Sequence, residues 1–181
     1  DGISGSIGFS WAKNSSRLYV SNFNLVPEKR DHSLTVLEDN GEAVAKIANF
    51  GTGEGNDIDE ACWTTLSEDG RKLYVSSFGG NVISEFDVDL SGNVSKVGDG
   101  SDTVYASRKA GTPGGDTKDM YLSADGKFMY VLGAYQTFTV SKFDLSNRGA
   151  LAFSDEYQVA AASETGAGAY NFLGLVGFDK K

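Results

Sequence analysis

The sequence predicts an all-β protein of the β-propeller class, with about three four-stranded blades and a closing strand. First, Tyr19, Tyr74 and Tyr130 recur at separations of 55 and 56 residues. Second, the segment 122–131 repeats 66–75 almost residue for residue, with a Ser-x-Asp-Gly turn ahead of a Tyr-Val strand. Third, the chain has 23 glycines, two prolines and 12% aromatic residues, which suits tight turns between strands. A period of this length containing about four strands is typical of a propeller blade.

The first blade is expected over residues 6–50. Its strands are runs of apolar and β-branched residues, predicted at 6–11, 17–23, 34–37 and 43–50. The segment 24–32 is an insertion between the second and third strands and contains the only histidine, His32. Such an insertion at the rim of a blade is either a functional loop or a solvated charged loop.

The second blade is expected over residues 61–98, after a glycine-rich acidic connection at 51–60. Its strands are separated by Asp-Gly, Gly-Gly and Ser-Gly-Asn, which are turn sequences that tolerate positive φ. Alternation puts Leu73 and Val75 on one face of their strand and Tyr74 on the other. We therefore expect this sheet to pack against neighbours on both sides.

The third blade is expected over residues 118–157, after a long link at 99–117. Its strands are predicted near 118–123, 127–133, 137–145 and 150–157. After a bridge of small residues, the apolar run 170–178 is predicted to form one more inner strand, the closing strand.

Three blades and a strand are too few to close a ring, because propellers have about four to eight blades. The two end faces of the stack would leave large apolar patches in water, and such patches mark interaction surfaces. We expect further chain or a partner to complete the ring: an N-terminal half of a longer polypeptide, the other product of a cleavage, or a second chain. The start at Asp1, without a methionine, fits a processed or truncated chain.

Composition narrows the partners and the compartment. The net charge is −9 and the basic residues are scattered, so neither nucleic acid nor an anionic membrane is expected as a partner. Cys62 is the only cysteine, which excludes an internal disulfide and leaves the redox compartment open. The sequons at Asn14 and Asn93 fall in predicted turns and indicate a secreted, extracellular glycoprotein. Chance triplets in a cytoplasmic protein are the alternative.

The segment 61–88 resembles a blade of the lactonase-family propellers, which include the 6-phosphogluconolactonase-like and YVTN-repeat proteins. The segment 122–131 is similar, and the resemblance covers most of residues 6–178. It implies the last three or so blades of a seven-bladed ring, the C-terminal half. It also implies hydrolysis of a sugar lactone at the central channel, or a related cycloisomerase that forms lactones. The cycloisomerases use His, Arg and Glu in the channel, whereas this chain has one histidine and no motif that aligns to those positions.

The resemblance places the site at the channel mouth, in the loops 57–60 and 115–119. Glu60 and Asp116 are 56 residues apart, so they occupy equivalent points of adjacent blades and are expected to face one another near the axis. One of them could act as general base, with Lys118 or Arg108 stabilising the oxyanion. Alternatively, carboxylates of these loops could bind a divalent cation such as Ca²⁺, which would polarise the lactone carbonyl. The candidate metal ligands are Asp57, Asp59, Glu60 and Asp116.

Each of these residues also has a structural interpretation. The carboxylates could be solvated or could cap backbone amides. Cys62 has no histidine nearby in sequence and fits buried packing better than a nucleophile. Trp63 could stack on a cyclic substrate, but packing between blades fits it better. Two further functional classes therefore stay open: a non-catalytic propeller that binds a protein or glycan, and a structural half-propeller subunit.

Overall fold

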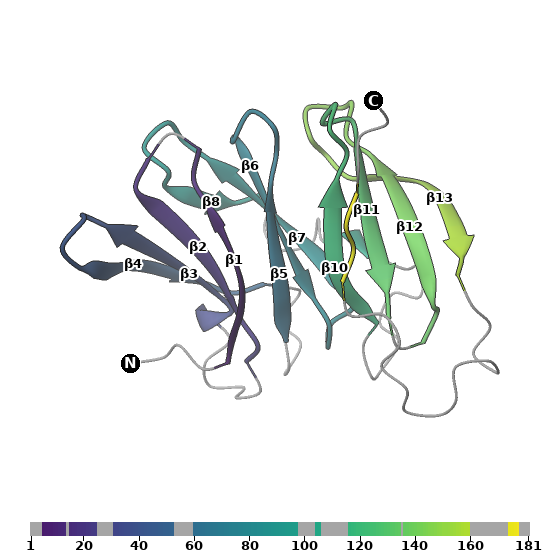
Figure 1. Ribbon diagram of the computed structural model, residues 1–181, viewed down its shortest axis with the longest axis horizontal. Helices are drawn as coiled ribbons and strands as arrows, with labels where there is room; N and C mark the ends of the chain where they lie inside the picture. Colours follow the sequence, from purple (N-terminus) through teal and green to yellow (C-terminus); the bar gives the residue numbers. More distant parts are fainter. Residues whose placement is uncertain are drawn as a thin grey trace.

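The protein consists of three antiparallel sheets that stand side by side like the blades of a fan (Figure 1). The computed structural model describes residues 5–13, 15–24, 31–52, 60–97, 104–105, 116–134, 136–159 and 174–177. Within these residues every strand pairs antiparallel with its neighbour along the chain, and no α-helix occurs. No helix long and apolar enough to cross a membrane is found in this part of the chain. The all-β propeller architecture expected from the repeat is therefore confirmed.

Each sheet is one blade, numbered here in chain order. Blade 1 contains β1 (Ser6–Trp11), β2 (Arg17–Asn22), β3 (Leu34–Asp39) and β4 (Val44–Phe50). Blade 2 contains β5 (Ala61–Leu66), β6 (Lys72–Ser77), β7 (Val82–Val88), β8 (Val94–Lys96) and β9 (Val104–Tyr105). Blade 3 contains β10 (Thr117–Leu122), β11 (Phe128–Gly133), β12 (Thr139–Asp144) and β13 (Ala152–Gln158).

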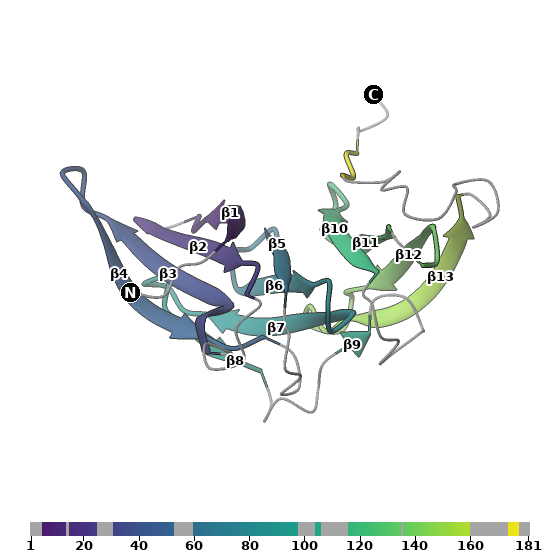
Figure 2. The ribbon, with the colours of Figure 1, turned by 90° about the horizontal axis from the view of Figure 1, so that it is seen from below.

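The blades form an arc with the first strands, β1, β5 and β10, along its concave side (Figure 2). The strands β4, β8 and β13 lie on the convex side (Figure 2). Strand β9 was not expected, because the sequence indicates only a link there. It pairs with Val82 and Ile83 of β7, while β8 pairs with the other end of that strand at Phe86–Val88. Two short strands thus share the fourth position of blade 2.

Two apolar layers hold the blades together, and the residues alternate between them as the pattern of β6 predicts. Leu73 and Val75 pack toward blade 1, in a layer with Tyr19, Leu34 and Val36. Tyr74 points the other way and packs against blade 3. Its layer also contains Ile83, Met120, Met129, Val131, Phe143, Leu145 and Leu151. Because β6 is buried on both faces, blade 2 is the centre of the stack.

The repeated Ser-x-Asp-Gly sequence forms the same turn in blades 2 and 3. The Ser67 hydroxyl donates to the Asp69 carboxylate at 2.6 Å, and Ser123 donates to Asp125 at 2.7 Å. The glycine that follows has φ of +69° at Gly70, a left-handed conformation that favours glycine. The turn chemistry is therefore local, which explains why the sequence could predict it.

The predicted closing strand, 170–178, is described only at 174–177. These four residues form no strand. They lie on the outer face of blade 3, where Leu175 N donates to Asp119 Oδ2 at 2.7 Å and Gly177 lies against the Tyr121 ring. The segment thus runs beside β10, as an inner strand of a further blade would, without forming the strand hydrogen bonds.

Candidate functional site

The candidate site lies where β5 and β10 begin, on the concave side of the arc (Figure 2). Glu60 directly precedes β5, and Asp116 directly precedes β10. The Glu60 carbonyl accepts a hydrogen bond of 2.9 Å from Phe78 N, and the Asp116 carbonyl accepts one of 2.8 Å from Ala134 N. Their backbones therefore occupy equivalent positions in blades 2 and 3, as the 56-residue spacing predicts.

The two side chains behave differently. Asp116 is buried, with 1% of its surface exposed. Its Oδ1 accepts from the backbone N of Gln136 at 2.7 Å and of Thr137 at 3.1 Å, and its Oδ2 accepts from the Thr137 hydroxyl. The carboxylate is thus turned into its own blade, where it caps the turn between β11 and β12. This differs from the expectation that it faces Glu60 at the axis, and agrees with the capping alternative.

Glu60 is half-buried and stands in the left-handed region with φ of +46°, which is strained for a residue other than glycine. Burial raises the pKa of its carboxyl, and the nearby Lys118 ammonium lowers that pKa in part. Glu60 and Lys118, which belong to adjacent blades, are therefore close enough to interact. A carboxylate held with a raised pKa beside a cation is a frequent arrangement at functional sites.

Lys118 lies over aromatic rings from the other two blades. Its Nζ is 4.3 Å from the centre of the Phe78 ring and 5.9 Å from that of Phe23, both within cation–π range. Phe23 and Phe78 follow the repeat tyrosines by four residues in the sequences Tyr-Val-Ser-Asn-Phe and Tyr-Val-Ser-Ser-Phe. Sequence reasoning missed them, although this shared offset could have identified them. Blade 3 has Ala134 at that position.

Asp119 is a further carboxylate at this end of β10 that was not among the expected site residues. Burial raises the pKa of its carboxyl, although its two oxygens accept backbone hydrogen bonds from Met120 at 2.8 Å and Leu175 at 2.7 Å. The side chain is half-buried and fixed by these bonds. Asp119 therefore contributes a fixed negative charge to the site more readily than a proton-transfer group.

Cys62 and Trp63 take the structural roles that sequence reasoning favoured. Cys62 is buried, and burial raises the pKa of its thiol to about 11. A thiol with this pKa is protonated at neutral pH and is a poor nucleophile. The Trp63 ring packs against Gly8 of β1, where an added Cβ would lie 2.6 Å from Trp63 Cε3. Trp63 thus fills the contact between blades 1 and 2.

The remaining site predictions are not described by the structure or stay untested. Asp57, Asp59, Arg108 and Asn14 lie outside the described residues, as does most of the loop 24–32. In the described part of the chain, no three or more His, Cys, Asp or Glu side chains come together to hold a metal. Because Asp116 already accepts three hydrogen bonds, the two described candidate ligands do not form a Ca²⁺ site by themselves. A divalent cation stays a prediction, and no chemical step below depends on one.

The search of known family models found no match to this chain. No curated protein matches its sequence either. Solved structures do match its fold. The periplasmic gluconolactonase PpgL of Pseudomonas aeruginosa superposes with a TM-score of 0.66 at 18% identity, over 85% of this chain and 41% of the other. A provisional 6-phosphogluconolactonase of Bacteroides uniformis gives 0.66 at 15% identity, with the same coverage.

A third structure widens the range of similar proteins. The β-propeller domain of Cps50 (Swd1) from Myceliophteria thermophila matches with a TM-score of 0.53 at 11% identity, over 86% of this chain and 44% of the other. At these identities the similarity shows the fold alone. The chain resembles gluconolactonase-type and other β-propellers and spans about two fifths of the length of the structures it matches.

Proposed function

We propose that the concave end of β5 and β10 forms part of a site that hydrolyses a sugar lactone. The observation that carries this proposal is the interaction between Glu60, whose pKa is raised by burial, and the Lys118 ammonium of the adjacent blade. A half-buried carboxylate of raised pKa suits a general base, and an ammonium suits the stabilisation of an oxyanion. The fold similarity to gluconolactonase-type propellers supports the choice of substrate class.

In the proposed reaction, the Glu60 carboxylate takes a proton from water while the water oxygen bonds to the lactone carbonyl carbon. The negative charge that develops on the carbonyl oxygen faces the Lys118 ammonium. When the tetrahedral intermediate collapses, the bond between that carbon and the ring oxygen breaks. The proton held by Glu60 then passes to the ring oxygen, and the product is the open hydroxy acid.

The test measures acid release from δ-gluconolactone in a pH-stat, with the spontaneous rate subtracted. We expect Glu60→Gln to lower the rate by about 100-fold or more, as is typical of a general base. We expect Lys118→Met to lower it by about 100-fold, as is typical of an oxyanion-stabilising group. Glu42→Gln, an exposed carboxylate in the turn between β3 and β4, is the matched control and should leave the rate unchanged. A wild-type rate equal to the spontaneous rate, or full activity in Glu60→Gln, would refute the proposal.

A non-catalytic binding function is the second candidate, supported by the aromatic surroundings of Lys118. Phe23 and Phe78 lie on either of two blades and share one cation, an arrangement that can bind the face of a sugar and an anionic group together. Calorimetric titration with gluconate distinguishes the two candidates. Binding that Lys118→Met abolishes, in a protein without turnover of δ-gluconolactone, would establish the binding function instead.

We also propose secretion and glycosylation at Asn93. Asn93 is exposed in the turn between β7 and β8, although its side-chain amide donates to Asp89 Oδ2 at 2.9 Å. A glycan on this amide would have to replace that contact. Expression through a eukaryotic secretory pathway tests the proposal, because glycosidase treatment should shift the mass of the wild type. With Asn93→Gln the part of the shift due to this site should be lost, and an unchanged shift would contradict the assignment.

A further inference from the structure

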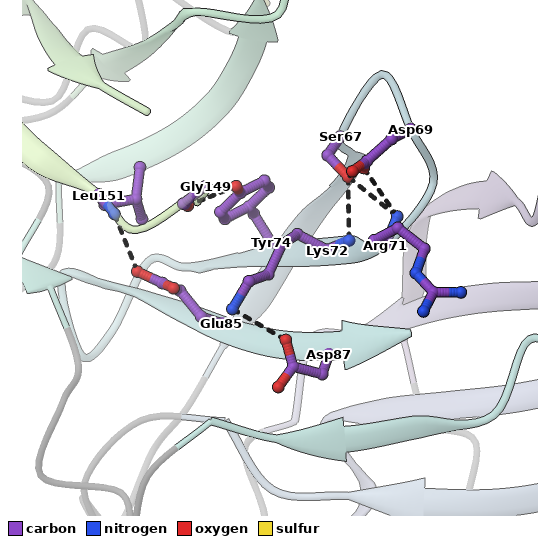
Figure 3. Close-up of polar contacts among 9 residues, drawn as sticks. All are labelled: Ser67, Asp69, Arg71, Lys72, Tyr74, Glu85, Asp87, Gly149 and Leu151. Carbon is purple, nitrogen blue, oxygen red and sulfur yellow. Dashed lines mark hydrogen bonds and ion pairs between the residues drawn. The ribbon is translucent and has the colours of Figure 1, made fainter. Parts of the chain in front are cut away.

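The same hydrogen bond joins each blade to the next. Tyr19 of blade 1 donates to the Gly92 carbonyl of blade 2 at 3.0 Å, and Tyr74 of blade 2 donates to the Gly149 carbonyl of blade 3 at 2.6 Å (Figure 3). Both tyrosines are on the second strand of their blade. Both glycines lie in the turn between the third and fourth strands of the next blade, with φ of +79° and +82°. The blade interface is thus directional: one face donates and the other accepts.

The outer face of blade 3 presents the donor half of this interface. Tyr130 occupies the position of Tyr19 and Tyr74 in the repeat. No hydrogen bond joins its hydroxyl to another of the described residues, and it lines a hollow of about 340 Å³ together with Tyr121 and Val140. Val176, which borders the same hollow, is 72% exposed. The face is apolar and polar in the same arrangement as the buried face of blade 2.

The opposite end of the stack presents the accepting half. In β1, Gly8 and Ser10 face blade 2, so Ile7, Phe9 and Trp11 face outward, and they are 42%, 63% and 50% exposed. Gly41 lies in the turn between β3 and β4 with φ of +85°, matching the accepting glycines of the other blades. An added Cβ at Gly41 would meet no atom within 4 Å, so the turn is open to a partner.

We propose that a second copy of this chain occupies these faces, with blade 1 of one copy packed on blade 3 of the other. The Tyr130 hydroxyl of one copy would donate to the Gly41 carbonyl of the other, which repeats the contact found twice within the chain. A copy is the occupant we infer because each chain carries both halves of the interface that already joins its own blades. Two such contacts related by a two-fold axis close a ring of six blades, within the range of about four to eight found in propellers.

The experiment uses two variants that each block one face. Phe9→Glu places a charge on the blade 1 face, and Val140→Glu places one on the blade 3 face. Native mass spectrometry and sedimentation equilibrium should show the wild type at twice 19.2 kDa. Each variant alone should be monomeric, whereas their equimolar mixture should form a heterodimer through its one intact interface. Leu90→Glu, a 75% exposed apolar residue in the turn between β7 and β8, is the matched control and should remain dimeric.

Tyr130→Phe refines the test, because it removes only the hydroxyl. We expect it to weaken association about fivefold per contact, the effect of one lost hydrogen bond. Circular dichroism verifies that every variant is folded. The proposal is overturned if the wild type is a monomer at about 100 μM, a concentration that would detect even weak dimers. It is also overturned if one face-blocking variant alone still dimerises, which indicates like-on-like pairing, or if the complex contains a different polypeptide. None of these outcomes depends on Glu60 or Lys118, so they are independent of the proposed hydrolysis.

Discussion

The Tyr74 hydroxyl donates a hydrogen bond of 2.6 Å to the carbonyl of Gly149, which lies 75 residues later in the chain and belongs to the next blade (Figure 3). Close by, Leu151 N donates to Glu85 Oε1 at 3.1 Å (Figure 3). On the concave side, the Ser76 hydroxyl donates to the Lys118 carbonyl at 2.7 Å. Polar contacts thus fix the relative position of blades 2 and 3 at both edges of their apolar layer. The position of Lys118 beside Glu60 depends on this docking.

Removal of the Tyr74 hydroxyl should destabilise the stack. Tyr74→Phe keeps the ring in the apolar layer but leaves the Gly149 carbonyl without this donor, which should cost about 1 to 3 kcal/mol. Urea unfolding followed by circular dichroism measures the change in the free energy of unfolding. Tyr157→Phe is the control, because Tyr157 is 71% exposed and its change should be within about 0.5 kcal/mol. Equal stabilities of the two variants would show that the contact contributes nothing.

Alkaline pH should unfold the protein as its buried tyrosines ionise. Burial raises the pKa of Tyr19 from 10.0 to about 12 and raises that of Tyr74 as well. A folded-state pKa above the unfolded value gives stability that is fully present below pH 10 and is lost as the pH rises toward 12. The tyrosinate absorbance should therefore have a late phase that coincides with unfolding, and Tyr74→Phe should reduce its amplitude. Complete titration near pH 10 in the folded protein would contradict this.

Asp116 should matter for stability whatever its part in chemistry. Asp116→Ala leaves the backbone N–H groups of Gln136 and Thr137 without their acceptor in a buried turn, and we expect a loss of about 3 kcal/mol. Asp155→Ala is the matched control on exposed strand β13, with an expected change within about 0.5 kcal/mol. Thermal or urea unfolding measures both. A Asp116→Ala protein as stable as the control would show that this cap is not required.

The pH dependence of δ-gluconolactone hydrolysis should report the Glu60 carboxyl. Since burial raises its pKa, the rate should rise with pH around a midpoint above the ordinary glutamate value of 4.5. The Lys118 ammonium lowers this pKa in part, so Lys118→Met should move the midpoint to higher pH in addition to slowing the reaction. A midpoint at or below 4.5, or a shift in the opposite direction, would exclude Glu60 as the base.

Two glycines separate the cost of backbone strain from the cost of a steric contact. Gly41→Ala places a side chain at φ of +85° in open space, and we expect a loss of about 1 kcal/mol. Gly149→Ala adds a Cβ 3.0 Å from the Tyr74 hydroxyl and 3.1 Å from Lys72 Cγ. We therefore expect a larger loss at Gly149, by about 1 kcal/mol or more. Equal losses in urea unfolding would mean that blades 2 and 3 adjust to the added methyl group.

The sequence by itself determined the blade repeat, the strand order and the buried faces of β6. These features depend on residues close together in the chain: alternation along Leu73, Tyr74 and Val75, and the Ser67 and Asp69 turn that Ser123 and Asp125 repeat. The sequence also determined that Glu60 and Asp116 have equivalent backbone positions, because the repeat length fixes that spacing.

Only the tertiary structure decided where those two carboxyl groups point. Asp116 binds the turn of its own blade, while Glu60 lies within the electrostatic influence of Lys118, on the next blade. The positions of Phe23 and Phe78 around Lys118, and the pairing of β9 with β7, also required the docked blades. The physical reason is that such contacts join residues of different strands and blades, and side-chain direction there depends on neighbours that the local pattern does not contain.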